Sequence, residues 1–212
     1  MKKILLVTAI YLTALSLNAQ WHKDDREIRT LLGNNTYTFG GYFGFGGGYA
    51  LIDDKDAILM SGRAVCLINR GLGLGFTGTG FINDYHYDAV LDDDVNLTGG
   101  YGGLIIEPIL FPRSPIHIAF PVVAGVGGIA YTRSDWYQED WYNREFREAR
   151  VEDSETFLVF EPGVEIELNM LKFFRLAGGV SYRYTTDIDL IDTPSNVLEG
   201  ITTSITVKFG KF

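Results

Sequence analysis

The sequence predicts an all-β chain, an eight-stranded antiparallel up-and-down transmembrane β-barrel, from three observations. First, the 212 residues combine 25 Gly with 14 Phe, 12 Tyr and 3 Trp at a mean hydropathy of +0.06. That composition is too aromatic for a disordered chain and too polar for a bundle of membrane helices. Second, apolar residues alternate with small or polar ones over eight segments. Third, the links between these segments differ in length at the two ends of the predicted barrel.

The first 19 residues have the layout of a secretory signal peptide. Lys2 and Lys3 precede an apolar run over 4–17, and small residues lead to Ala19. Because this run is shorter than the roughly 20 residues of a membrane helix, we interpret 1–19 as an export signal. A buried N-terminal helix is the alternative. Residues 20–35 are predicted to form an N-terminal periplasmic segment or a plug, and residues 36–212 the barrel.

The strands are recognised by the two-residue period of extended chain. We predict them at 36–50, 57–69, 71–83, 98–110, 116–132, 156–168, 172–186 and 200–212. In the first strand, Phe39, Phe43 and Phe45 share one face, while the other face is mostly Gly and Thr. The second and third strands also keep one face free of charge. Such strands suit a bilayer better than a soluble core.

The later strands carry charges on one face only. In 156–168, three Glu residues oppose Leu158 and Phe160, and in 172–186 two Arg residues oppose Tyr182 and Tyr184. The run 99–103 is nearly all Gly and fits either phase, so the phase of the fourth strand stays open.

The links between strands alternate in length. The second, fourth and sixth links, at 69–71, 111–115 and 169–171, are short. On the other side the first link, 53–56, is also short, but those at 84–96, 133–155 and 187–199 are long. Short turns at one end and long loops at the other are typical of bacterial outer-membrane barrels, whose short turns face the periplasm. An even number of strands places both termini on that side. The predicted location is therefore the cell outer membrane, reached by export.

The chain resembles the small eight-stranded outer-membrane barrels of the OmpA/OmpX type over residues 36–212. The resemblance rests on the strand pattern, the loop asymmetry and the C-terminal Phe212, without a signature motif. Such barrels usually end in an aromatic residue recognised by the insertion machinery. Phe212 departs from the pattern because it is out of phase with the apolar series Ile205, Val207 and Phe209. The resemblance implies contact with outer-membrane lipids and lipopolysaccharide.

Charged residues on the inward faces predict a lumen network. Its members are Arg63, Glu107, His117, Glu161, Glu165, Glu167, Arg175 and Arg183. An eight-stranded barrel is just wide enough for side chains to fill it, and an unpaired buried charge is costly, so opposite charges should pair there. We expect Glu165 or Glu167 to face Arg175, and a hairpin centred near Arg113 to place His117 diagonal to Glu107. The lumen is then a closed, salt-bridged plug or a narrow gated or ligand-holding passage.

The loops at the predicted extracellular end are acidic. Twenty of the 27 Asp and Glu residues lie in 53–56, 84–96, 133–155 and 187–199, most densely at 92–94. They either keep this end solvated or hold divalent cations that bridge to anionic lipopolysaccharide. No specific metal site is predicted, because the run lacks the spacing and Gly of an EF-hand loop.

The loop 133–155 is also rich in aromatic residues. These are Trp136, Tyr137, Trp141, Tyr142 and Phe146. An exposed group of this kind is a candidate binding surface for an extracellular protein or a glycan. The alternative is that the rings cover the barrel mouth or belong to the outer aromatic girdle.

Composition excludes several other functions. The net charge of −9 argues against a nucleic-acid partner, and the single Cys and three His residues supply no zinc site, so no cofactor is predicted. We predict no enzyme. A lipid A-modifying barrel uses a His and a Ser at its outer rim, but His86 has no Ser near it, and His117 lies near the periplasmic end without a nucleophile.

The leading hypothesis is an integral outer-membrane barrel with a structural, adhesive or binding role carried by its loops. The alternative is a soluble secreted or periplasmic lipocalin-like barrel that binds an apolar ligand. The two differ in the direction of the apolar faces, which point outward in the first and inward in the second.

Overall fold

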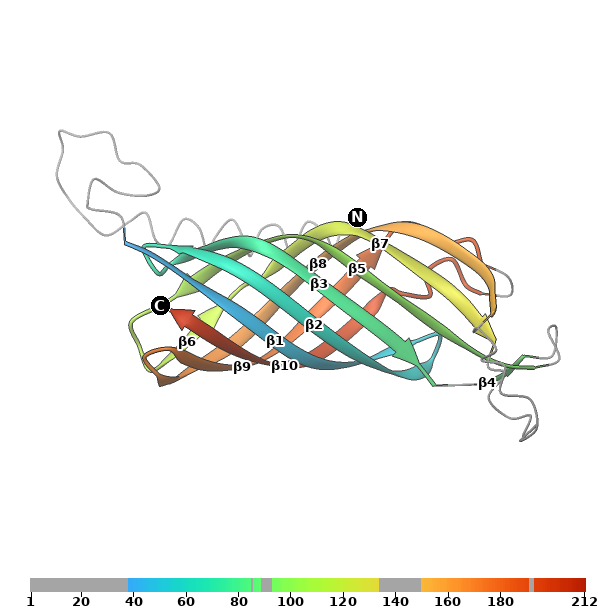
Figure 1. Ribbon diagram of the computed structural model, residues 1–212, viewed down its shortest axis with the longest axis horizontal. Helices are drawn as coiled ribbons and strands as arrows, with labels where there is room; N and C mark the ends of the chain where they lie inside the picture. The colour runs from blue at the N-terminus through green and yellow to red at the C-terminus, as the bar shows by residue number, and fades with distance from the viewer. Residues whose placement is uncertain (1–37, 85, 89–92, 134–149, 191–192) are drawn as a thin grey trace, which may run out of the picture. The chain divides into compact units, whose positions relative to one another are not determined.

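The wall of the barrel consists of antiparallel strands that follow one another along the chain (Figure 1). The structure, a computed structural model, describes residues 38–84, 86–88, 93–133, 150–190 and 193–212; residues 1–37, which include the predicted signal peptide 1–19 and the predicted segment 20–35, fall outside this part. The strands are β1 Phe39–Ile52, β2 Lys55–Ile68, β3 Leu72–Asn83, β4 His86–Asp88, β5 Asp93–Leu110, β6 Ile116–Ala119, β7 Val122–Arg133, β8 Arg150–Leu171, β9 Phe174–Thr185 and β10 Gly200–Lys211.

These strands close into a ring of eight. β1 pairs with both β2 and β10, and β3 pairs with β5, so the sheet joins itself. β6 and β7 together make one wall strand between β5 and β8, and β4 is a short extension that pairs with β5. The predicted eight-stranded antiparallel barrel is therefore confirmed. No helix among the described residues is long and apolar enough to cross a membrane.

Two strands are longer than their sequence pattern predicts. β5 starts at Asp93, which pairs with Asp88 of β4, and β8 starts at Arg150, which pairs with Arg133 of β7. The open phase of the fourth strand is also settled. Tyr101 is buried in the lumen, so the glycines on either side of it face outward.

Prolines interrupt one stretch of wall. Pro121 separates β6 from β7. Pro162, on β8, lies opposite Val122, the first residue of β7. Proline has no N–H for the ladder, so pairing is irregular here. Neighbouring groups still bond across the break: Gly163 N–H donates to the Pro121 carbonyl at 2.8 Å, and Phe120 N–H donates to the Pro108 carbonyl at 2.9 Å.

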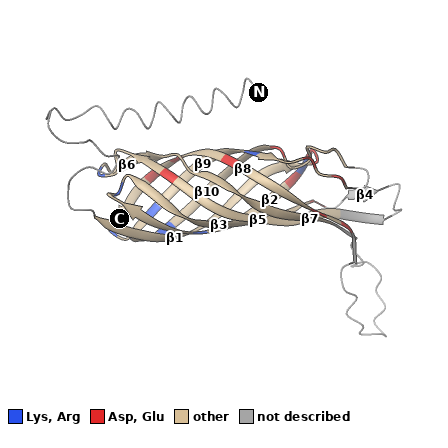
Figure 2. Ribbon diagram, turned by 90° about the horizontal axis from the view of Figure 1, so that it is seen from above, with Lys and Arg blue, Asp and Glu red and all other residues tan. Residues whose placement is uncertain are grey.

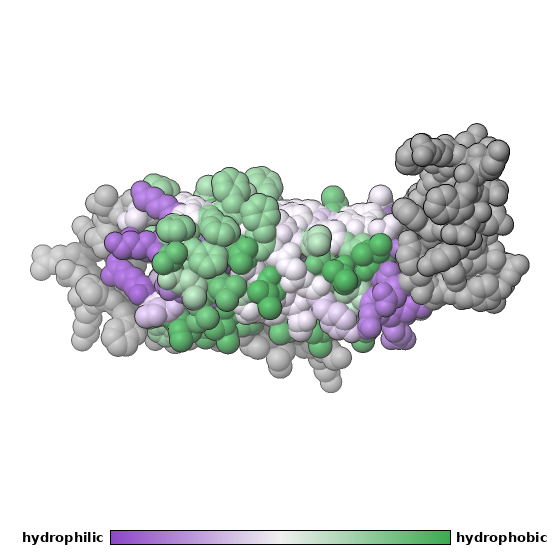
Figure 3. Space-filling model, turned by 60° about the horizontal axis from the view of Figure 1, so that its bottom comes forward, coloured by the Kyte–Doolittle hydropathy of each residue, from purple (hydrophilic) through white to green (hydrophobic). Residues whose placement is uncertain are grey.

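The outward faces are apolar, as the predicted phases require. Phe76 is 69% exposed, Ile205 is 67% exposed and Phe43 is 65% exposed. Figure 3 shows apolar side chains over much of the visible wall, with hydrophilic residues toward both ends. The charged side chains of the same strands point inward. The distribution of apolar and charged residues is therefore the reverse of that in a soluble protein, with the apolar ones outside and the charged ones inside.

We name the two ends of the barrel by their links. The turn end holds 69–71, 111–115 and 172–173 together with the start of β1 and the end of β10; the loop end holds the 53–54 turn and the long links. Figure 2 shows basic residues toward the turn end and acidic residues at the loop end, in addition to charges inside the barrel. Apolar residues pack inside at both levels, around Tyr42 and Leu67 near the turn end and around Phe157 and Leu97 near the loop end.

Candidate functional site

The turn-end half of the lumen is filled by a charged cluster that we call the turn-end network. It consists of Tyr42, Arg63, Glu107, His117, Glu165, Glu167, Arg175 and Lys208. Six of these were predicted as lumen residues from inward charge. Tyr42 and Lys208 were left out, although both lie on the inward face of strands whose phase the sequence predicts.

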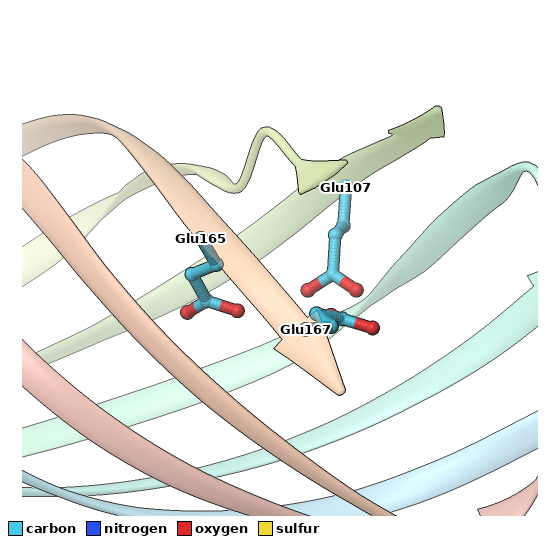
Figure 4. A group of neighbouring side chains, drawn as sticks. All are labelled: Glu107, Glu165 and Glu167. Atoms are coloured by element: carbon cyan, nitrogen blue, oxygen red, sulfur yellow. The ribbon is translucent and has the colours of Figure 1, made fainter. Parts of the chain in front are cut away.

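Lys208 on β10 is the centre of this network. Its fully buried ammonium contacts Glu165 at 2.8 Å, both carboxylate oxygens of Glu107 at 3.3 Å, and Glu167. Figure 4 shows Glu165 and Glu167 on β8 and Glu107 on β5, with their carboxylates turned into the barrel. One oxygen from each lies within 4.8 Å of the others, a spacing that a metal ion could use. The Lys208 ammonium already supplies the positive charge and the hydrogen-bond donors for all three carboxylates, so we assign no metal to this cluster.

Arg63 on β2 connects the carboxylates from the other side. Its guanidinium contacts Glu165 at 2.8 Å and Glu107 at 3.4 Å. The hydroxyl of Tyr42 donates to Glu107 at 2.7 Å, and the Lys208 ammonium lies 5.0 Å from the centre of the Tyr42 ring. Each carboxylate therefore has partners from other strands, which is the condition for charges to be held away from water.

His117 pairs with Glu167, and the predicted position beside Glu107 is wrong. The register sets Ile109 opposite Ala119, so the hairpin is centred on Ser114, one residue beyond the expected centre. His117 instead lies directly across from Glu167 on β8, with Nε2 2.5 Å from Oε2. Arg175 contacts the same oxygen of Glu167 at 3.2 Å and the His117 Nε2 at 3.1 Å.

Phe212 closes the lumen at the turn end. Its ring packs against Tyr42 with centroids 5.8 Å apart, and the Arg175 guanidinium carbon lies 3.8 Å from its centre. The predicted phase explains this position: a residue out of register with the outward series points into the barrel.

A small polar cavity lies between the two halves of the lumen. It has a volume of about 70 Å³, and its lining includes Ser61, Thr77, Thr79, Tyr101, Glu161, Ser181, Thr202 and Ser204. Glu161 accepts hydrogen bonds from the Tyr101 and Ser181 hydroxyls, both at 2.5 Å. A cavity of this size holds a few water molecules and is well below the roughly 300 Å³ of small-molecule sites.

The loop between β9 and β10 fills the loop-end half, which the sequence did not predict. Its apolar side chains, Ile188, Leu190, Val197 and Leu198, are buried against apolar residues of the wall. We call these four residues the loop-end cap. The cap is held by hydrogen bonds as well: the Leu198 carbonyl accepts from Arg183 Nε at 2.7 Å, and Asp189 N–H donates to Glu155 at 2.5 Å.

Arg183 differs from the other lumen charges. Its side chain is fully buried, and its guanidinium carbon lies 5.7 Å from the Tyr101 ring centre and 5.9 Å from that of Phe81. Its two terminal nitrogens have no hydrogen-bond partner among the described residues. The predicted network therefore splits in two, with Arg183 and Glu161 apart from the turn-end network.

The outer rim of the loop end is acidic and partly aromatic. A hollow of about 590 Å³ on this rim is bordered by Asp53, Asp54 and Glu199 together with Tyr49 and Tyr182. The predicted aromatic loop surface, Trp136, Tyr137, Trp141, Tyr142 and Phe146, lies outside the described residues, as does the side chain of His86.

Comparison with known proteins shows the fold. No protein-family model matches the sequence, and no curated protein has significant similarity to it. The structure of Neisserial surface protein A (NspA) matches with a TM-score of 0.53 and 15% identity, over 84% of this chain and 100% of that chain. The N-terminal β-barrel domain of Pseudomonas aeruginosa OprF gives a TM-score of 0.45 and 11% identity, over 81% and 96%. Ail of Yersinia pestis, in complex with the heparin analogue sucrose octasulfate, gives a TM-score of 0.45 and 12% identity, over 81% and 97%. The likeness to NspA confirms the predicted fold, that of the small eight-stranded outer-membrane barrels.

Proposed function

We propose that this chain is an integral outer-membrane protein with a closed lumen, whose structural, adhesive or binding role is carried by the loop end. One observation supports the membrane location above all others: a closed ring of strands that is apolar outside and charged inside. An outward apolar band of this kind is stable against lipid tails and costly against water.

The alternative, a lipocalin-like carrier, requires the opposite arrangement. Its lumen would be apolar and open to a ligand, whereas Glu107, Glu165 and Lys208 occupy this lumen. The cavity of about 70 Å³ between the two halves of the lumen is too small for an apolar ligand of ordinary size. We therefore favour the membrane protein over the carrier.

The charges of the two ends support an orientation. The turns at the turn end carry Arg70, Arg113 and Lys172, and no acidic residue. The loop end carries most of the acidic residues, among them Asp53, Asp54 and Glu199. We place the turn end in the periplasm and the loop end outside the cell. There the carboxylates would meet lipopolysaccharide through bridging divalent cations, and the aromatic residues of 134–149 would contact an extracellular protein or a glycan.

The proposed role is neither transport through the lumen nor catalysis. Phe212 and Arg175 close one end, and the loop-end cap fills the other. His117, the histidine whose side chain the structure describes, is 1% exposed and bonded to Glu167, so an external substrate would not reach it.

Heat-modifiability of the exported chain tests the location. Expressed with residues 1–19 intact, the protein should fractionate with the outer membrane, and its gel mobility should shift on boiling, as a closed barrel requires. A soluble periplasmic protein without a shift would overturn the proposal. Single-channel recording in planar bilayers tests the closed lumen and should show no steady conductance. Deletion of 134–149 tests the binding role of the loop and should abolish partner binding while the heat shift remains.

A further inference from the structure

The turn end carries a basic hollow that the proposed function does not explain. It has a volume of about 700 Å³, and its lining includes Arg70, Arg113, Lys172, Met170 and Leu171, together with Arg175 and Phe212, which close the lumen at this end. Arg113 and Lys172 are exposed, and Arg70 is half-buried. The turns 69–71, 111–115 and 172–173 and the end of β8 at 169–171 contain no Asp or Glu, so these three cations are not neutralised within their own turns.

The turns that carry these cations are joined into one frame. Asn169 donates from its side chain to the Ser114 carbonyl and from its backbone to the Pro115 carbonyl, both at 2.8 Å. Arg70 Nε donates to the backbone oxygen of Phe212 at 3.3 Å, and Ile109 N–H donates to the Gly71 carbonyl at 2.8 Å. Because the frame fixes the turns relative to one another, the basic side chains start from fixed positions around the hollow.

Two residues of this frame adopt a backbone conformation that their side chains disfavour. Arg70 has φ of 61° and Phe111 has φ of 56°, the left-handed region where glycine is the usual residue. The other described non-Gly residues with positive φ are Asp53, Asp54 and Asn69, of residue types that tolerate this region better. Arginine and phenylalanine at positions where glycine would be less strained indicate that the side chains themselves have a role at this end of the barrel.

Exposed apolar side chains lie in or next to the same turns as these cations. Phe111 is 70% exposed, Phe173 is 59% exposed and Met170 is 56% exposed. Exposed rings and aliphatic chains at the same end of the barrel as these guanidinium and ammonium groups match an amphiphile that has acyl chains and an anionic head. Guanidinium groups bind phosphate oxygens in bidentate fashion, and ammonium groups add charge.

We infer that this hollow binds the phosphodiester headgroup of an anionic phospholipid in the leaflet around the turn end. The inference rests on the proposed membrane location, since it needs a lipid leaflet at this level. Arg70, Arg113 and Lys172 hold the phosphate, while Phe111, Met170 and Phe173 lie against the acyl chains. A phospholipid without net charge has the same chains but gains less from three cations, so the site is selective for the anionic lipid.

The test is native mass spectrometry of the exported full-length chain in detergent. The chain is titrated with phosphatidylglycerol and with phosphatidylcholine of the same acyl chains. Only protein that shows the heat shift on gels is used, so a failure of the barrel fold or of membrane location is detected separately. The wild-type chain should bind phosphatidylglycerol at least tenfold more tightly. Neutralising one basic residue should lower this preference by about fivefold at low ionic strength.

The variants separate a built site from general surface charge. R70Q/R113Q/K172Q should bind the two lipids about equally. K211Q is the matched control, because Lys211 is an exposed cation of the same end that does not line the hollow; it should keep the preference. R70G relieves the backbone strain at the cost of the bond from Arg70 to Phe212; in protein that shows the heat shift, it should still lose selectivity.

Several results would overturn the inference. Equal binding of both lipids by the wild type would do so, as would an unchanged preference in the triple variant. A loss in K211Q as large as the loss from neutralising Arg70 alone, as in R70G, would show a diffuse charge effect. Displacement of the lipid by millimolar inorganic phosphate would show a site for free anions instead.

Discussion

The two halves of the lumen are filled in different ways. In the turn-end half, residues of the wall supply ions, and each carboxylate has cationic partners from other strands, as Glu165 has Arg63 and Lys208. In the loop-end half, apolar wall residues pack against a loop, and the buried cation Arg183 donates to a backbone carbonyl. The stability of the ion-paired half depends on every charged partner being present, whereas the stability of the apolar half depends mainly on the volume of the side chains that fill it. Substitutions should therefore have unequal effects in the two halves.

The largest effect should come from Lys208→Met. The substitution removes the ammonium that three buried carboxylates share, and Arg63 and Arg175 are left to neutralise all three. Breaking a buried ion pair from one side costs about 3–5 kcal/mol. Urea unfolding in lipid vesicles, with the folded fraction measured by the heat shift on gels, should show a loss of that order in the free energy of unfolding.

Two controls show whether this loss is electrostatic. Lys211→Met removes an exposed cation of the same strand and should change the free energy of unfolding by less than about 0.5 kcal/mol. Lys208→Met combined with Glu107→Gln removes one uncompensated charge and should recover part of the loss. No recovery in the double variant would argue against the charge explanation.

The sequence predicts the turn-end half better than the loop-end half, for a physical reason. Inward charges such as Glu165 and Arg175 follow from the two-residue period, because the phase of a strand decides its inward face. The pairing of His117 was missed, since a one-residue shift in the centre of a turn changes every partner across the hairpin. The cap was missed because Ile188 and Leu198 lie in an acidic, aperiodic loop whose path no local pattern determines. The same holds for Arg183, whose carbonyl acceptor belongs to that loop.

A smaller effect is expected from Leu198→Ala in the cap. Removing a fully buried leucine side chain costs about 2–5 kcal/mol where the site cannot collapse. A loop is freer to adjust than a strand, so we expect the lower end of that range in urea unfolding. Ser195→Ala, an exposed position in the same loop, should have no measurable effect. A loss for Leu198→Ala that equals the loss for Lys208→Met would remove the distinction between the two halves.

The smallest effect should come from Arg183→Met, and its contrast with Lys208→Met is the sharpest test of the comparison. Both replace a fully buried cation with an apolar side chain of similar length. Arg183 has no ion pair among the described residues, and its terminal nitrogens are without hydrogen bonds there. Replacing it therefore removes a desolvated charge as well as the hydrogen bond to Leu198, and these effects oppose each other. We expect the free energy of unfolding to stay within about 1 kcal/mol of the wild-type value. A loss of 3 kcal/mol or more, measured in the same vesicles, would mean that Arg183 has an ionic partner of its own and that both halves of the lumen depend on paired charge.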